Sequence, residues 1–231
     1  GHLNICKEAI EHFTGIKVVG YLPRREDLSL PERHLGLIPT VESAANNEFL
    51  QKLITQCEAT FDIDTIIQIA GQTTSLPSGQ SVFPAVPLPA RTRIAVARDK
   101  AFSFYYQDNL DILEAWGAEI IPFSPLIDKA LPTDISGLYI GGGFPELYAA
   151  ELASNEPLKH EIKAVASKGI PVYAECGGLM YLGENVTDFE GKKHPMVGAI
   201  PVCSGIDNHR LSLGYRTVQS LVNGPLLGRD E

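Results

Sequence analysis

The segment from Pro171 to Leu182 constrains the fold most, because an apolar run stops abruptly at a cysteine that two glycines follow. A sharp turn from strand to helix lifts its central side chain clear of a sheet if the residues two before and two after are small. Ala174 and Gly178 meet that condition on either side of Cys176. Amides at the start of the following helix would then stabilise a thiolate. We therefore expect Cys176 to be a nucleophile, with a buried core cysteine as the alternative.

The part of the chain that begins near Arg93 alternates short apolar runs with amphipathic segments. This alternation predicts a mostly parallel sheet flanked by helices, an α/β fold. The expected strands are 94–97, 119–123, 137–140 and 170–174, and the expected helices are about 104–116 and 157–168. Beyond the cysteine, we expect strands over 195–202 and 211–220 that form an antiparallel return on one side of the sheet.

The first 70 residues resemble only part of an α/β domain, with a helix over 7–13, a strand over 16–22 and a helix over about 41–57. Residues 71–91 are rich in Gly, Ser and Pro and lack periodicity, so they are expected to be a linker. The predicted organisation is therefore a partial domain over 1–70, the linker, and a second domain over 92–231.

Composition excludes several classes of function. The formal net charge of −9, without a basic stripe, argues against nucleic acid as a partner. No apolar run is long enough for a membrane span, and the first residues do not resemble a signal peptide. The four cysteines are scattered without a C-x-x-C pair, which argues against a zinc site or a disulfide framework. These features favour a cytoplasmic protein.

A reactive cysteine needs hydrogen-bond donors for the oxyanion of its intermediate. Gly141, Gly142 and Gly143 follow the expected strand 137–140 directly, so they should lie at the same sheet edge as Cys176. Together with the amide of Gly177 they are candidate oxyanion donors, although a tight turn without function is the alternative. The chain contains no G-x-x-x-x-G-K-[ST] phosphate loop.

The base that would accept the thiol proton is not evident. Only His194 and His209 follow Cys176 among the histidines. His194 stands in an expected turn beside Lys192 and Lys193, where a solvated side chain is the default. His209 precedes an expected strand and could be a surface residue or a ligand, so neither histidine is assigned the role.

Several segments together resemble one family. Gly-Gly-Gly-Phe-Pro-Glu at 141–146, Ala-Glu-Cys-Gly-Gly-Leu-Met-Tyr-Leu at 174–182 and Leu-Gly-Tyr-Arg at 213–216 resemble the class I glutamine amidotransferase domain of cobyrinic acid a,c-diamide synthases. Upstream, segments 20–24 and 31–37 resemble the end of the ATP-dependent synthetase domain of the same enzymes. The resemblance spans nearly the whole chain in the family's order.

This resemblance implies that the amidotransferase part hydrolyses glutamine through a thioester on Cys176, with Gly141–Gly143 as oxyanion donors. It also implies that the ammonia serves a synthetase part that uses ATP and Mg²⁺ to amidate the a and c carboxylates of cobyrinic acid in cobalamin biosynthesis. Arg24, Arg33 and His34 become candidates near the synthetase site. The implied partners are glutamine, cobyrinic acid or a related corrinoid, and the rest of the synthetase; a homodimer stays open.

Two departures from the family pattern lead us to expect an internal fragment that is inactive alone. The family's phosphate loop lies at the start of the synthetase domain, and its catalytic histidine follows the Leu-Gly-Tyr strand, beyond Glu231. Two alternatives remain: a related amidotransferase that acts on nickel sirohydrochlorin or hydrogenobyrinic acid, and a binding module that has kept the fold without catalysis.

Overall fold

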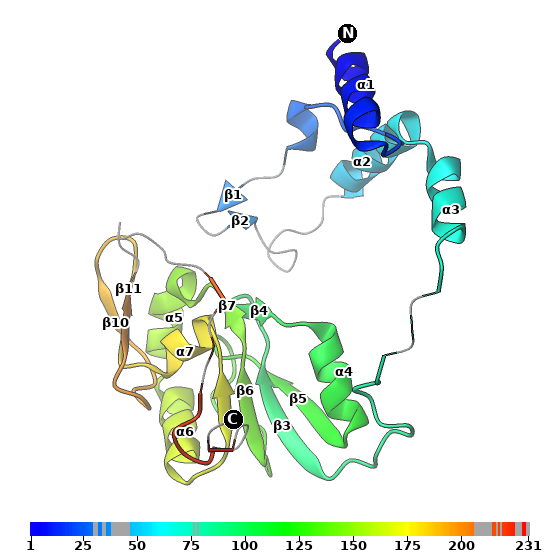
Figure 1. Cartoon of the computed structure of the whole chain (residues 1–231). Coiled ribbons are helices and arrows are strands. Elements are labelled where there is room, and N and C mark those ends of the chain that lie inside the picture. The colour runs from blue at the N-terminus through cyan, green and yellow to red at the C-terminus, as the bar shows by residue number, and fades with distance from the viewer. Residues whose placement is uncertain are drawn as a thin grey trace. The chain divides into compact units, whose positions relative to one another are not determined.

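The chain forms two compact units, Gly1–Gln80 and Ser81–Glu231, drawn in Figure 1. The boundary between them falls inside the segment 71–91 that the sequence analysis treats as a linker. A computed structural model describes residues 1–29, 32–33, 36–37, 47–75, 77, 79–205, 214–215, 217, 219–224 and 228–229.

The first unit consists of short helices and one small hairpin. Its elements are α1 (His2–Thr14), η1 (Glu26–Leu28), β1 (Glu32–Arg33), β2 (Gly36–Leu37), α2 (Asn47–Thr60) and α3 (Ile63–Gly71). The helix predicted over 7–13 is confirmed as part of α1, which ends at Gly15 in the left-handed conformation (φ 68°). The helix predicted over about 41–57 corresponds to α2 where it is described, whereas residues 41–46 lie outside the described part.

Two predictions for this unit differ from the structure. The strand predicted over 16–22 is wrong, because the segment forms only an isolated bridge between Gly20 and Phe61 and pairs with no strand among the described residues. Helix α3 was not predicted, although Asp62 provides an N-cap by accepting a hydrogen bond from the Thr65 amide at 3.0 Å. Neither α1 nor α3 contains a buried residue.

The second unit is organised around a parallel sheet in the order β5-β3-β6-β8. The order places β3, the first strand of this sheet along the chain, inside the sheet, so the crossover connections run in both directions from it, as in doubly wound folds. The predicted strands 94–97, 119–123, 137–140 and 170–174 are all confirmed here. Their observed bounds are β3 (Thr92–Ala97), β5 (Ala118–Phe123), β6 (Gly137–Ile140) and β8 (Val172–Ala174).

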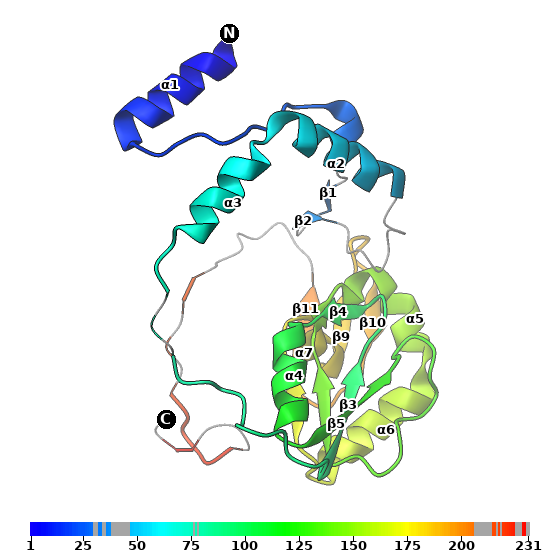
Figure 2. The same cartoon turned by 90° about the vertical axis from the view of Figure 1, so that its right-hand side faces the viewer.

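Helices cover both faces of this sheet. Figures 1 and 2 show α4 (Gln107–Ala115) on one face and α5 (Ala149–Ser154) and α6 (Glu156–Ser167) on the other. Side-chain alternation along the strands divides the core accordingly: Ala95 and Ala97 pack in the larger cluster with Leu158 and Ile162 of α6, and Val96 packs in the smaller one on the α4 side. Helix α6 has a proline in its first turn, as its sequence indicates.

Short elements at the end of the sheet differ from the predictions. The helix predicted from residue 104 begins only at Gln107, because β4 (Phe102–Phe104) instead pairs antiparallel with β7 (Gly142–Gly143). The chain then continues through the 3₁₀ helix η2 (Pro145–Tyr148) into α5. Hydrophobic periodicity predicts neither of these two helices. These elements follow the carboxyl ends of β3 and β6 and surround the predicted glycine segment.

The described strands after the cysteine form a small sheet that is separate from the main one. Helix α7 (Gly177–Leu182) leads to β9 (Asn185–Thr187), which pairs antiparallel with β10 (Lys193–Pro195) and parallel with β11 (Cys203–Gly205). The strand predicted over 195–202 is therefore wrong except at its first residue. Most of the strand predicted over 211–220 lies outside the described residues.

Candidate functional site

Cys176 lies in a strained turn directly after β8. Its backbone has φ 50° and ψ −116°, a positive φ that few residues other than glycine adopt. The residue is exposed, so the alternative of a buried core cysteine does not apply. A Cβ at Gly178 would lie 2.1 Å from the carbonyl oxygen of Ile140, and therefore only glycine fits two residues after the cysteine. This is the predicted geometry of a nucleophile elbow.

Gly141 is held by a tyrosine. Its amide donates a hydrogen bond to the Tyr105 hydroxyl oxygen at 2.8 Å, and the same hydroxyl donates to the carbonyl of Ala97. Burial raises the pKa of Tyr105, so the hydroxyl keeps its proton. The Gly141 amide thus has a partner within the fold.

Gly142 and Gly143 form β7 and lie next to the cysteine. A Cβ at Gly142 would stand 3.4 Å from the Cβ of Cys176. A Cβ at Gly177 would stand 3.2 Å from both the nitrogen and the oxygen of Gly143, which brings the elbow and β7 into direct contact. Gly177 is the first residue of α7, and an amide at that position has no acceptor within its own helix. Three of the four predicted glycines therefore meet at the elbow that carries Cys176.

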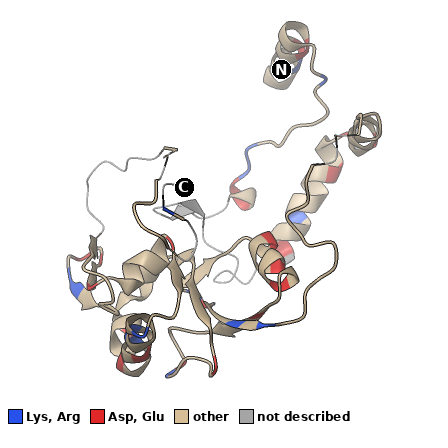
Figure 3. Cartoon of the chain, turned by 60° about the horizontal axis from the view of Figure 1, so that its bottom comes forward, with Lys and Arg blue, Asp and Glu red and all other residues tan. Residues whose placement is uncertain are grey.

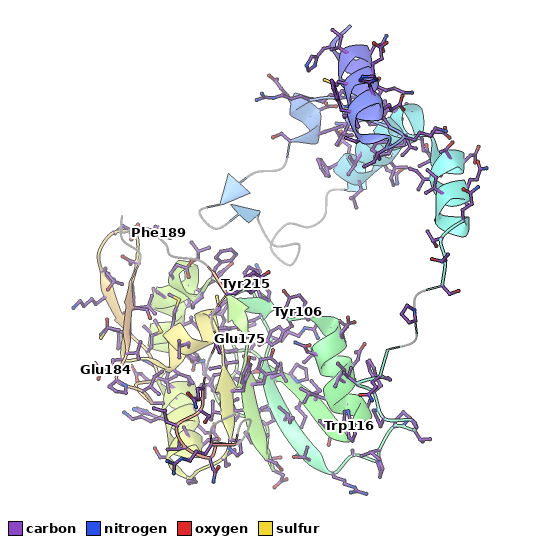
Figure 4. The ribbon with its side chains drawn as sticks, in the orientation of Figure 1. Tyr106, Trp116, Glu175, Glu184, Phe189 and Tyr215 are labelled. Carbon is purple, nitrogen blue, oxygen red and sulfur yellow. The ribbon has the colours of Figure 1, made fainter. Side chains whose placement is uncertain are left out.

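The sequence analysis did not identify the carboxylate that precedes the cysteine. Glu175 Oε1 accepts a hydrogen bond from the Tyr139 hydroxyl at 2.8 Å, and Oε2 lies 3.5 Å from that of Tyr173. Burial and this carboxylate raise the pKa of Tyr139. The two tyrosines are register partners on β6 and β8, with ring centroids 5.1 Å apart. Figure 4 labels Glu175 at the end of the sheet. The sequence signal that could have indicated this contact is the tyrosine in each of two expected neighbouring strands.

His194 is not the solvated turn residue that the sequence analysis expected. It lies in β10 and is buried, with Nε2 2.6 Å from Oδ2 of Asp188. The hydrogen bond from His194, and those from the backbone amides of Lys192 and Glu190, hold the pKa of Asp188 below its usual value. The ring of His194 is thus paired with Asp188 inside the small sheet.

The candidates from the first unit are only partly described. Arg24 is exposed and borders a cavity of about 530 Å³ together with Arg25 and Glu26. Arg25 is occupied by Asp27, with an N–O distance of 2.7 Å. Arg33 belongs to β1, but its side chain is not described. His34 and His209 lie outside the described residues, and the structure therefore does not bring the set of Arg24, Arg33 and His34 together.

The described residues contain neither a cluster of metal-ligating side chains nor a helix able to span a membrane. Within them, no three His, Cys, Asp or Glu side chains are grouped so that they could hold a metal ion. The helices of the described part are too short or too polar to cross a bilayer. Figure 3 shows basic and acidic residues interspersed along the ribbon.

A parallel α/β sheet that ends in a strained, exposed cysteine beside a glycine segment defines the class of nucleophile-elbow α/β proteins. Within that class, the chain belongs to the family of CobB/CobQ-like glutamine amidotransferase domains, whose model matches residues 93–224. The match begins within β3 and includes both the glycine segment and Cys176.

Individual relatives share one name. Cobyrinate a,c-diamide synthase of Dehalococcoides mccartyi (strain CBDB1) is 50% identical over 93% of this chain and 47% of the relative. The enzyme of that name from a Synechococcus species is 41% identical over 100% of this chain and 50% of the relative. The one from Salmonella typhimurium is also 41% identical, over 95% of this chain and 48% of the relative. The chain spans about half the length of the curated relatives it matches.

Proposed function

We propose that this chain is the glutamine-hydrolysing part of a cobyrinate a,c-diamide synthase. The observation that carries the proposal is the exposed, strained Cys176 held against Gly142 and Gly143, in a chain that belongs to an amidotransferase family. The strained backbone is a cost that proteins retain chiefly where function requires it. The name shared by relatives of 41–50% identity supports cobyrinate as the acceptor of the ammonia.

In the proposed reaction, the thiolate of Cys176 attacks the side-chain amide carbon of glutamine. The carbonyl π electrons move to oxygen, and amides from the β7 segment and Gly177 stabilise the oxyanion that forms. Collapse of this intermediate breaks the C–N bond, and ammonia leaves with a proton from a general acid. Water then attacks the thioester, which releases glutamate and regenerates the thiol.

The general base stays unassigned among the described residues, because His194 is buried in its pair with Asp188. In this proposal, the ATP and Mg²⁺ sites of the parent enzyme lie mostly outside this chain. The first unit would then contribute to the synthetase part; its helices α1 and α3 lack buried residues, which is compatible with packing against further protein.

The deciding experiment separates glutamine hydrolysis from amide formation in a full-length enzyme that carries this sequence. The Cys176→Ser variant should lose glutamine-dependent amidation of cobyrinate and keep amidation with ammonium salts. The glutamine-derived electrophile 6-diazo-5-oxo-norleucine should label Cys176 and no other cysteine. Cys203→Ser is the matched control, since Cys203 is also an exposed free thiol of the second unit. Labelling elsewhere, or equal loss of both activities in Cys176→Ser, would overturn the proposal.

A further inference from the structure

Glu175 is held at four points, two on its backbone and two on its side chain. Its amide donates to the carbonyl of Ile140 at 3.1 Å, and its carbonyl accepts from the amide of Gly178 at 2.8 Å. Its carboxylate accepts from Tyr139 at 2.8 Å and lies 3.5 Å from the hydroxyl of Tyr173. Partners from β6, β8 and α7 therefore fix the one residue that immediately precedes the strained cysteine.

A residue with a positive φ persists only when its surroundings over-determine its backbone, because the conformation costs about 1–3 kcal/mol. In Cys176 the side chain cannot supply that restraint, since the thiol is exposed. The restraint on the Gly178 side comes from close packing against Ile140. On the other side it comes from Glu175, whose backbone and carboxylate are both held by hydrogen bonds.

We propose that Glu175 is a positioning residue for Cys176: the Tyr139 hydroxyl holds its carboxylate toward β6, which fixes the elbow with the thiol exposed and keeps the negative charge turned away from the sulfur. The proposal deepens the proposed function, because it concerns the same nucleophile. Glu175 does not touch glutamine in this account; it acts only through the backbone and the electrostatic surroundings of Cys176.

The ionisable groups around the Glu175 carboxylate are mainly phenols. Tyr139 on β6 and Tyr173 on β8 contact it, and Tyr105 lies close enough for the carboxylate to raise its pKa. Asp99 and Arg98 act on Tyr105 from the end of β3, with opposite signs. The described partners of the carboxylate are thus hydroxyl groups, and a carboxylate that loses them is free to turn toward the thiolate, where two negative charges repel.

Three variants test the proposal. Glu175→Gln keeps a hydrogen-bond acceptor for Tyr139 but removes the negative charge, and Glu175→Ala removes both the acceptor and the charge. Tyr139→Phe removes the nearer of the two hydroxyl donors. The measurement is the rate of iodoacetamide alkylation of Cys176 against pH, followed by mass spectrometry, with Cys203 as an internal reference. Near-ultraviolet circular dichroism verifies that each variant folds, and the exposed Tyr106→Phe serves as the matched control.

We expect the plateau rate at high pH to fall about threefold or more in Glu175→Ala and Tyr139→Phe, and to stay near that of the wild type in Glu175→Gln. In Tyr139→Phe the midpoint of the profile should also rise by about 0.5 pH unit or more, because the charge is released. Equal plateau rates for the alanine and glutamine variants, or a Tyr139→Phe profile identical to that of the wild type, would overturn the proposal. If Tyr139→Phe does not fold, the two Glu175 variants decide alone.

These outcomes differ from a failure of the proposed function. If 6-diazo-5-oxo-norleucine does not label Cys176 in the full-length enzyme, glutamine hydrolysis is refuted, yet the alkylation profiles still report whether Glu175 positions the thiol. Conversely, normal labelling with unchanged profiles would refute the role of Glu175 and leave the amidotransferase reaction intact.

Discussion

Gly142 lies so close to Cys176 that a Cβ on the glycine would stand 3.4 Å from the Cβ of the cysteine. The two residues come from different turns, one after β6 and one after β8, and β7 brings its backbone directly to the elbow. Backbone amides can approach a reacting group this closely only where no side chain intervenes. The missing side chain of Gly142 therefore allows the β7 backbone to lie directly against the elbow at Cys176.

Gly142→Ala should preserve the fold and impair access to the thiol. The added Cβ would meet Phe104 Cβ at 3.3 Å and Cys176 Cβ at 3.4 Å, so the neighbours must shift by a few tenths of an ångström. We expect the alkylation of Cys176 to slow by about threefold or more, with no change at the reference thiol Cys203. Alkylation at the wild-type rate would show that β7 does not border the path to the sulfur.

Gly178→Ala should destabilise the second unit severely. Its Cβ would lie 2.1 Å from the carbonyl oxygen of Ile140, a backbone atom that cannot move aside without disturbing β6. We expect a loss of about 3 kcal/mol or more in the free energy of unfolding, measured by urea denaturation.

The matched control for Gly178 is Gly137→Ala, at the other end of β6, the strand that contains Ile140. There the nearest atoms to an added Cβ, in Ile94 and Pro171, are 3.8 Å away, which is ordinary contact. The change in stability should stay within about 1 kcal/mol. Similar losses in both variants would mean that the sheet, rather than the elbow, is intolerant of side chains.

The features that sequence could predict are those with a local signal. Apolar runs of strand length give the four parallel strands, and Ala174 and Gly178 give the elbow because the requirement for small residues acts within five positions. The contact of the glycine segment with Cys176 also follows, since both come after parallel strands whose carboxyl ends share one edge.

The features that sequence missed depend on partners far along the chain. The burial of His194 requires the pairing of β10 with β9, whereas the adjacent lysines and Gly191 indicate a solvated turn. The bond from Gly141 to Tyr105 joins residues 36 positions apart. Strand β7 has only two glycines, so neither side-chain alternation nor β propensity could have identified it.

The two adjacent tyrosines 105 and 106 should respond very differently to removal of the hydroxyl. Tyr105→Phe leaves the Gly141 amide and the Ala97 carbonyl without their present partner, which should cost about 1–3 kcal/mol of unfolding free energy. Tyr106 is 81% exposed, so Tyr106→Phe should leave stability unchanged. Urea denaturation of both variants is the measurement, and equal stabilities would contradict the role of Tyr105 as the anchor of the glycine segment.

The pair of Asp188 and His194 should make the stability of the second unit sensitive to acid. Hydrogen bonds to its carboxylate lower the pKa of Asp188 in the folded state, whereas an unfolded aspartate titrates near about 3.9. The stabilisation is therefore complete above the unfolded pKa and is lost as the pH falls through the lower, folded pKa. Its contribution should begin to decline below about pH 4 and should be lost once the pH falls below the folded pKa.

Asp188→Asn removes this titration and provides the test. Thermal unfolding between pH 7 and pH 3 should show a smaller decrease in Tm for Asp188→Asn than for the wild type, because other carboxylates titrate equally in both proteins. Glu190→Gln is the matched control: Glu190 is exposed in the same turn and contributes its backbone amide, not its carboxylate, to Asp188. The control should therefore follow the wild type. Parallel curves for Asp188→Asn and the wild type would show that the buried His194 is held in β10 by packing, without help from the charge of Asp188.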